Sequence, residues 1–488
     1  MPDLIEPVPA GALPRFRGLA LRSFLFGAGS IAQKVVGVLL VPIIARALTT
    51  AEFGRLEILS TVITTVTSIT VLGMDVVVTR RWVDLDEAGR SRMFSSWVAL
   101  ATLLGGSAAA TAAILAPSLS RLVFDTADLA PAVRVVGLCA LVNLLSVVGL
   151  TALRNQDRSR AYAAITVTAV VVNAILSGVL VWWLRTVEAV LIGLTLATSL
   201  GAAMALFAAR RLLVRRPSPK TAGTLLLASS PLVPGLLFAS GGDLASRFVL
   251  LERAGATEVG FYSVAIRFVG VGLLVHTGFQ LAWQPRAYGI AHQPGGRRRL
   301  GDDAALISVI LALVTVALGC LSPELLRLLA GSRYEAALPA VGIGLLVPLA
   351  TLLLTISSTP LAIANRLRAL GATTAAAALT SVALTMLLAG PHGAAGAMAA
   401  LAGGQLLGAA LAFRLARGSP TTAEFGRWTW AVLMVVSAAV TLAATLPPGG
   451  LAMAPRGLAL AGFVGLVGWR QPGFLGAGLA VLRPPQRR

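Results

Sequence analysis

Long apolar segments alternate with short polar ones along almost the whole chain. A helix needs about 20 apolar residues to cross a bilayer, and a window of about 19 residues detects about fourteen such segments here. They are residues 23–45, 56–78, 94–116, 131–153, 161–184, 187–209, 226–250, 260–283, 304–321, 338–362, 370–389, 393–413, 429–446 and 457–481. The pattern therefore predicts an all-α polytopic membrane protein.

The connections between these segments are short. About fourteen spans of about 20 residues leave roughly 14 residues for each connection, which is too few for a folded extramembrane domain. The composition agrees, since 57% of the residues are hydrophobic and 12% are charged, against about 45–50% and about 25% in soluble proteins. These values exclude a soluble multidomain enzyme and a disordered chain. The two cysteines, Cys139 and Cys320, lie in apolar segments, which excludes a disulfide framework.

The charge is strongly basic, with 40 Lys and Arg against 20 Asp and Glu. A nucleic-acid-binding protein would gather this charge on one face or tail. Here the basic residues form short clusters between apolar segments, so we expect no nucleic-acid partner. With the N-terminus placed inside, the inner connections hold 28 Lys and Arg and the outer connections hold nine. Because cytoplasmic loops carry the basic excess, both termini are predicted to be cytoplasmic.

Two parts of the chain resemble each other at a constant offset of 206 residues. The string TAEFGRL at residues 50–56 aligns with ATEVGFY at residues 256–262. The same offset aligns Glu52 with Glu258, Gly54 with Gly260, Arg80 with Arg286, Pro117 with Pro323, Arg121 with Arg327, Arg160 with Arg366 and Arg211 with Arg417. Six helices, an even number, make up the repeat, so both copies enter the membrane from the same side. We expect two six-helix lobes facing one central cavity, with two C-terminal helices outside them.

This organisation predicts seven consecutive parts of the chain. They are a cytoplasmic N-terminal segment (1–22), the N-lobe (23–209), a basic cytoplasmic linker (210–225), the C-lobe (226–413), a second cytoplasmic linker (414–428), the two additional helices (429–481) and a basic cytoplasmic tail (482–488).

Charged residues inside the predicted spans mark candidate functional positions, because a charge in the bilayer costs at least about 2.5–3.5 kcal/mol. They are Lys34, Glu57, Asp75, Asp243, Arg247 and Arg267. They fall in the first two spans of each lobe, as a shared central cavity requires. Small and polar residues share the helix face with two of these cations: Gly27, Ser30 and Gly37 with Lys34, and Gly260, Ser263 and Gly270 with Arg267. Such a face is suited to protein or water rather than lipid.

Most of these positions also have a structural interpretation. Asp243 and Arg247 are four residues apart and can neutralise each other. Glu57 lies in the first turn of its span, where a carboxylate suits the helix dipole. Asp75 lies little more than one turn before two arginines and can pair with them. Lys34 and Arg267 have no obvious partner on their own helices, which favours a role in the cavity.

The signs of these charges bear on the substrate. Three cations and three anions give a mixed cavity, whereas an exporter of cationic drugs needs carboxylates without competing arginines. Lysine and arginine suit a phosphate group, and the carboxylates are candidates for binding a coupling proton or sodium ion. His276, His292 and His392 show no ligand spacing, and the chain has no P-loop and no nucleophile elbow. We therefore expect no metal, no cofactor and no catalytic residue.

Several strings resemble one family of membrane proteins. These are GAGSIAQKVVGVLLVPIIARALTTAEFGRLEIL, LGMDVVVTRRW, DLASRFVLLERAGATEVGFYSVAIRF, FQLAWQPRAYGI, SPELLRLLAGSRYEAALPA and GPHGAAGAMAA. In order and spacing they are similar to the polysaccharide flippases of the multidrug/oligosaccharidyl-lipid/polysaccharide (MOP) exporter superfamily. The resemblance covers about residues 20–415 and is most specific around residues 243–290. It implies a fold like that of the multidrug (MATE) transporters.

The resemblance also implies a function. Such a protein moves an undecaprenyl-pyrophosphate-linked oligosaccharide across the bacterial inner membrane by alternating access, for the biosynthesis of cell-surface polysaccharide. Cationic residues of the cavity meet the pyrophosphate, and the matching positions are Arg46 and Arg267. Lys34 and Arg247 are added from their own positions in the spans. The expected partners are the lipid-linked oligosaccharide, membrane lipids and other membrane proteins of polysaccharide assembly.

Other functions stay open. Fourteen spans resemble the lipid II flippases of the superfamily, but the stretch GVLLVPI lacks the additional arginine that these carry before the exit of the first helix. A multidrug or small-molecule exporter is disfavoured by the mixed charge. A membrane glycan polymerase or ligase is disfavoured by the short connections, and a scaffold without transport would leave the intramembrane charges unexplained.

Overall fold

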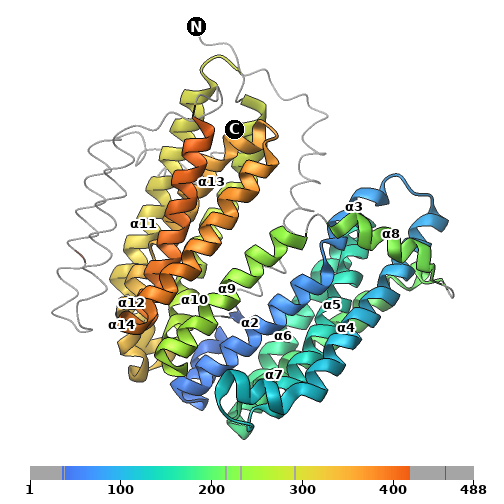
Figure 1. The fold of residues 1–488 in the computed structure, drawn as a ribbon, viewed down its shortest axis with the longest axis horizontal. Coiled ribbons are helices and arrows are strands. Elements are labelled where there is room, and N and C mark those ends of the chain that lie inside the picture. The colour runs from blue at the N-terminus through green and yellow to red at the C-terminus, as the bar shows by residue number, and fades with distance from the viewer. Residues whose placement is uncertain are drawn as a thin grey trace, which may run out of the picture. The chain divides into compact units, whose positions relative to one another are not determined.

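The computed structural model describes residues 36–37, 39–214, 217–230, 233–290, 293–417 and Gly457 (Figure 1). Every regular element within these ranges is a helix, and they contain no strand, which confirms the predicted all-α class. The chain forms two compact units, Met1–Ser240 and Gly241–Arg488. Most of the predicted span at 23–45, the predicted span at 429–446 and all of the span at 457–481 except Gly457 lie outside the described residues.

The first unit is built of long helices whose starts are fixed by local capping. They are α2 (Thr50–Val71), α3 (Met74–Trp82), α4 (Glu87–Phe124), α5 (Ala130–Asn155), α6 (Ser159–Leu184), α7 (Val187–Ala208), the 3-10 turn η1 (Arg210–Leu212) and α8 (Pro219–Ser229). Thr49 and Glu52 form a reciprocal capping box at the start of α2. Asp86 caps α4 and Thr186 caps α7 through a backbone amide three residues on. These helix starts therefore follow from the sequence itself.

The predicted span at 56–78 is interrupted. Leu72 and Gly73 both adopt left-handed backbone conformations, with φ of 53° and 70°. They end α2 and start α3 with a bend of 44°. A left-handed pair cannot continue an α-helix, so Asp75 lies in the first turn of a new helix rather than inside the old one.

The linker after α7 is hydrogen-bonded to α4. The hydroxyl of Ser95 donates to the carbonyl oxygen of Leu212 (3.1 Å) and accepts from the amide of Val214 (2.8 Å). The hydroxyl of Ser96 accepts from the amide of Ser218 (2.9 Å). Helix α8 then packs on α3 and α4. The described residues 212–214 and 218–229 are therefore docked against α3 and α4.

The second unit starts within a helix. Its elements are the later part of α9 (Val233–Ala254), α10 (Ala256–Ile290), α11 (Gly296–Ala330), the 3-10 turn η3 (Ser332–Ala337), α12 (Leu338–Gly344), α13 (Val347–Ile363) and α14 (Leu367–Ala416). The first part of α9 belongs to the first unit, where the carbonyl oxygen of Ser240 accepts from the hydroxyl of Thr65 on α2 (3.3 Å). The two units therefore divide at Ser240 and Gly241, inside α9.

Helix α14 is a hairpin of two helices joined at Gly393, where the backbone is non-helical (φ 53°, ψ −133°). A Cβ on Gly408 would lie 2.8 Å from the Cβ of Ala377 and 3.1 Å from the carbonyl oxygen of Thr373, so residues 394–416 run back along residues 367–392. The second arm is capped from another helix, because Glu258 of α10 accepts a hydrogen bond from the amide of Ala394 (2.7 Å). The two arms correspond to the predicted spans at 370–389 and 393–413.

The two units repeat one succession of helices. Helices α2 and α10 start at Thr50 and Ala256, and α4 and α11 end at Phe124 and Ala330, which are both offsets of 206. The N-terminal caps of α6 and the first arm of α14 also match, because Arg158 donates to the carbonyl oxygen of Ala208 (2.6 Å) and Arg366 donates to that of Leu415 (2.7 Å). The alignment of Arg160 with Arg366 was wrong by two residues, since Arg158 makes the equivalent contact.

The helices are long and apolar enough for a membrane protein. Within the described residues eight helical segments meet this test, and the bent pair α2 and α3 makes a ninth. One of the eight is the hairpin α14, which holds two of the predicted spans. The chain is therefore a multi-pass membrane protein.

Candidate functional site

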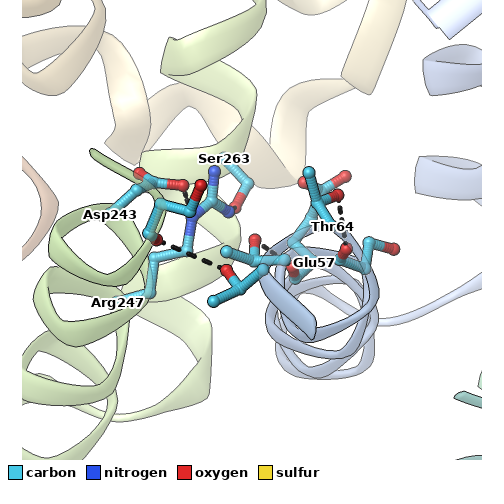
Figure 2. A network of polar contacts seen from close by, with 9 residues as sticks. Glu57, Thr64, Asp243, Arg247 and Ser263 are labelled. Atoms are coloured by element: carbon cyan, nitrogen blue, oxygen red, sulfur yellow. Dashed lines mark hydrogen bonds and ion pairs between the residues drawn. The ribbon is translucent and has the colours of Figure 1, made fainter. Parts of the chain in front are cut away.

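The strongest cluster of the predicted site residues lies on α9 and α10 in the second unit (Figure 2). Arg247 on α9 is only 6% exposed. Its guanidinium lies 3.4 Å from the carboxylate of Asp243, one turn earlier, and donates to the hydroxyl of Ser263 on α10 (3.2 Å). The same guanidinium lies 5.4 Å from the ring centre of Tyr262. An arginine at this depth is stabilised by such partners, so the spacing of Asp243 and Arg247 correctly predicted an ion pair.

Arg267 shares a helix face with this cluster. It follows Ser263 by four residues on α10, so the two side chains lie on the same side of the helix. Arg267 is half-buried. It lies 11 residues after the start of α10, which places it about 16 Å into the helix at 1.5 Å per residue. This is near the middle of a membrane span, where a cation is costly and usually functional.

The carboxylates of the first unit lie on α2 and α3. Glu57 is half-buried and lies in the second turn of α2, since the helix starts at Thr50. The prediction that it lies in the first turn was wrong, because Glu52 occupies that place. Asp75 is half-buried in the first turn of α3, where the helix dipole favours a carboxylate. In the described part of the chain Asp75 makes no ion pair with Arg80 or Arg81. The structure therefore separates Glu57 from Asp75 by the bend at Leu72 and Gly73.

The remaining predicted cations are placed differently. Arg46 is exposed, at the end of the helical residues 39–47 that precede the capping box of α2. Lys34 lies outside the described residues. The structure thus brings Asp243 and Arg247 next to the face of α10 that carries Arg267. Arg46 lies apart from them, at the end of a helix.

Sequence reasoning missed two contributors to the site. Tyr262 is buried against Arg247, and Glu258 caps the second arm of α14. Both lie in the string ATEVGFY that the repeat singled out, but their contacts depend on which helices pack together. His276 was interpreted as structural, and it contacts the hydroxyl of Thr355 on α13 (3.0 Å). Within the described ranges no group of three or more His, Cys, Asp or Glu side chains could hold a metal ion.

The arrangement defines a class: a polytopic helical membrane protein of two repeated units with charged residues inside its helices. The profile of the family described as "Polysaccharide biosynthesis protein" matches residues 43–339. The chain therefore belongs to the polysaccharide biosynthesis protein family. Its comparison with curated proteins found no match.

Solved structures of the MOP superfamily share the fold. An inward-facing multidrug resistance MATE transporter aligns with a TM-score of 0.62 and 15% identity, covering 83% of this chain and 95% of its own. The lipid II flippase MurJ in an inward closed conformation aligns with a TM-score of 0.67 and 11% identity, covering 92% and 99%. A transporter from Pyrococcus furiosus, described by a binding pocket of reverse polarity, aligns with a TM-score of 0.57 and 16% identity, covering 85% and 95%. The fold and the polysaccharide biosynthesis family that the sequence resemblance implied are confirmed.

Proposed function

We propose that the protein is a flippase that moves an undecaprenyl-pyrophosphate-linked oligosaccharide from the inner to the outer leaflet of the bacterial inner membrane. Membership of a polysaccharide biosynthesis family and the fold of MOP transporters support a flippase. The sequence resemblance further supports a lipid-linked oligosaccharide as the cargo and alternating access as the mechanism. The distribution of basic residues supports cytoplasmic termini.

Arg267 is the observation that most directly supports this cargo. A guanidinium near the middle of a membrane span provides paired donors that match the oxygens of a phosphate group. Arg46 and Lys34 are proposed as further cations along the path of the pyrophosphate. Arg247 is proposed to add positive charge to the same face of α10 while it is held by Asp243 and Ser263.

The carboxylates are proposed to couple transport to an ion gradient. Asp243 has a side chain that is 45% exposed despite its contact with Arg247, so it can exchange a proton or bind sodium. Glu57 and Asp75 are the candidates in the first unit.

The test uses a host in which the gene is deleted and complemented with variants. We expect the deletion to accumulate one undecaprenyl-linked oligosaccharide that an impermeant probe cannot reach from outside. Arg267→Ala and Lys34→Ala should lower flipping at least about tenfold at an unchanged amount of protein, because each removes charge-assisted contacts to phosphate. The measurement is mass spectrometry of the lipids with and without the probe.

Two controls make the result specific. Arg160→Ala removes an exposed arginine at the start of α6 and should leave flipping unchanged. Wild-type flipping by both cavity variants would overturn the pyrophosphate site. An unchanged lipid pool in the deletion host, with altered sensitivity to toxic compounds, would replace the proposal with a multidrug exporter.

A further inference from the structure

Helix α2 carries a continuous polar face that the charges alone do not explain. Glu57, Ser60, Thr64 and Ser68 follow one another at spacings of three and four residues, so they line one side of the helix. Figure 2 shows Glu57 and Thr64 on this side of α2. Thr64 is exposed and the other three are half-buried. The less buried residues on the other side are Val62, Val66 and Ile69, which suit lipid.

The hydroxyls of this face are able to bind a ligand. Thr64 donates to the carbonyl oxygen of Ser60 (3.0 Å), which leaves the lone pairs of its own oxygen as acceptors. Within the part of the chain that the structure describes, the hydroxyls of Ser60 and Ser68 make no hydrogen bond. By contrast, the hydroxyls of the buried Thr65 and Thr67, on the flanks of this face, donate hydrogen bonds to the carbonyl oxygens of Ser240 and Ile63.

The repeat provides an internal comparison. At the offset of 206, the positions of Glu57, Ser60, Thr64 and Ser68 in α2 are taken in α10 by Ser263, Ile266, Gly270 and Leu274. The fold therefore accepts apolar residues at three of these four positions. Thr64 satisfies its hydroxyl within its own helix, but an unbonded polar group in a membrane helix is costly. The hydroxyls of Ser60 and Ser68 therefore favour a ligand over a purely structural role.

We infer that the hydroxyl face of α2 binds the sugar part of the transported lipid. Sugars carry many hydroxyl groups that both donate and accept hydrogen bonds, and serine and threonine hydroxyls match them without imposing a charge. This inference rests on the proposed function and adds to it the surface that recognises the glycan.

The test compares two ligands on the purified full-length chain. One is the undecaprenyl-pyrophosphate oligosaccharide extracted from the deletion host, and the other is the same lipid trimmed to a single sugar. The variant is the triple change Ser60→Ala, Thr64→Val and Ser68→Ala, which leaves Glu57 in place. The matched control is Thr70→Val, Thr102→Val and Thr198→Val, which removes three hydroxyls bonded to their own helices in the first unit.

The readout is the ratio of the two dissociation constants. Wild type and control should bind the oligosaccharide at least about tenfold more tightly than the trimmed lipid, and the triple variant should bring this ratio close to one by losing several hydrogen bonds. Arg267→Ala should weaken both ligands and keep the ratio. An unchanged ratio in the triple variant, or a ratio near one in wild type, overturns the inference. Binding of neither lipid by wild type overturns the proposed function itself.

Discussion

Arg247 combines a full charge with burial inside a helix of a membrane protein. Its guanidinium contacts Asp243 on its own helix and two neighbouring residues of α10, Tyr262 and Ser263. Removing one partner of a fully buried charge pair costs about 3–5 kcal/mol, and the cost is smaller here because the side chain of Asp243 is 45% exposed and solvent screens its charge. At the residue scale Arg247 therefore joins α9 to α10 in addition to any contact it makes with a substrate.

Replacing Arg247 by methionine separates these two roles. Arg247→Met should lower the melting temperature of the purified protein by about 2–5 °C, because it removes the contacts to Ser263 and Tyr262 and leaves the carboxylate of Asp243 without its ion pair. The comparison is Arg267→Met, which we expect to melt close to wild type. Differential scanning fluorimetry in detergent measures both. A normal melting temperature together with lost transport would assign Arg247 to substrate binding alone.

At the scale of elements, the corner of α14 depends on a residue 135 positions earlier in the chain. Gly393 has φ of 53° and ψ of −133°, a conformation that only glycine adopts readily. A Cβ at this position would also meet the carboxylate of Glu258 that caps the second arm. The equivalent corner of the first unit is capped locally by Thr186, so the two lobes build the same hairpin by different means.

A double-mutant cycle tests this corner. Gly393→Ala should destabilise the protein by about 1–3 kcal/mol through backbone strain and the clash with Glu258. Glu258→Ala should cost about 0.5–2 kcal/mol through the lost cap. The double variant should lose less than the sum, because the clash is gone. Thermal unfolding of the four proteins measures the coupling, and strict additivity would contradict the contact.

Much of the helical structure could be predicted from the sequence. Within the described residues most predicted spans correspond to observed helices, because long apolar segments and capping residues such as Thr49 and Asp86 are local signals. The span at 226–250 is divided between α8 and α9, so its prediction as one helix was wrong. The span at 338–362 is divided between α12 and α13, which together still form one segment apolar enough to cross a membrane. The bend at Leu72 was missed because a left-handed leucine has no clear sequence signature. The offset of 206 found the repeat, but it misaligned Arg366 because the stretch from the end of α11 to the end of α13 is two residues longer than the stretch from the end of α4 to the end of α5.

The candidate site was predictable only in part. The spacing of Asp243 and Arg247 predicted their ion pair, since residues four apart share a helix face. Tyr262 as the ring beside Arg247 was not predictable, because nothing in the sequence fixes which turn of α10 packs against α9. The same limit applies to Glu258 and Ala394.

At the scale of the whole molecule, the distribution of basic residues predicts the orientation of the chain in the membrane. The connections predicted to be cytoplasmic hold 28 basic residues, against nine in the opposite set. In the first unit, Arg80 and Arg81 lie in the last turn of α3, and Arg210 and Arg211 lie in η1 after α7. Both places are predicted to face the cytoplasm. Helix α8, which follows this basic connection, is predicted to lie on the cytoplasmic side.

Cysteine labelling of whole cells tests this orientation. Ser332→Cys lies in a predicted outer connection and should react with an impermeant maleimide, whereas Ala88→Cys lies in a predicted inner one and should react only after the cells are opened. Both positions are exposed. The native Cys139 and Cys320 are buried and should contribute little background. Labelling in the reverse pattern would invert the topology.

The cap that Glu258 provides to Ala394 also bears on how the chain is made. Synthesis runs from the N-terminus, so α10 is complete more than one hundred residues before Gly393 emerges. The last hairpin of the second lobe therefore closes onto a helix that is already present. In the first lobe Thr186 is part of the hairpin that it caps, so that hairpin can close as soon as it is inserted. The second lobe must therefore assemble in a fixed order, with α10 in place before the hairpin closes. In a chain truncated after α13, the carboxylate of Glu258 would lack the amide of Ala394 as its hydrogen-bond donor.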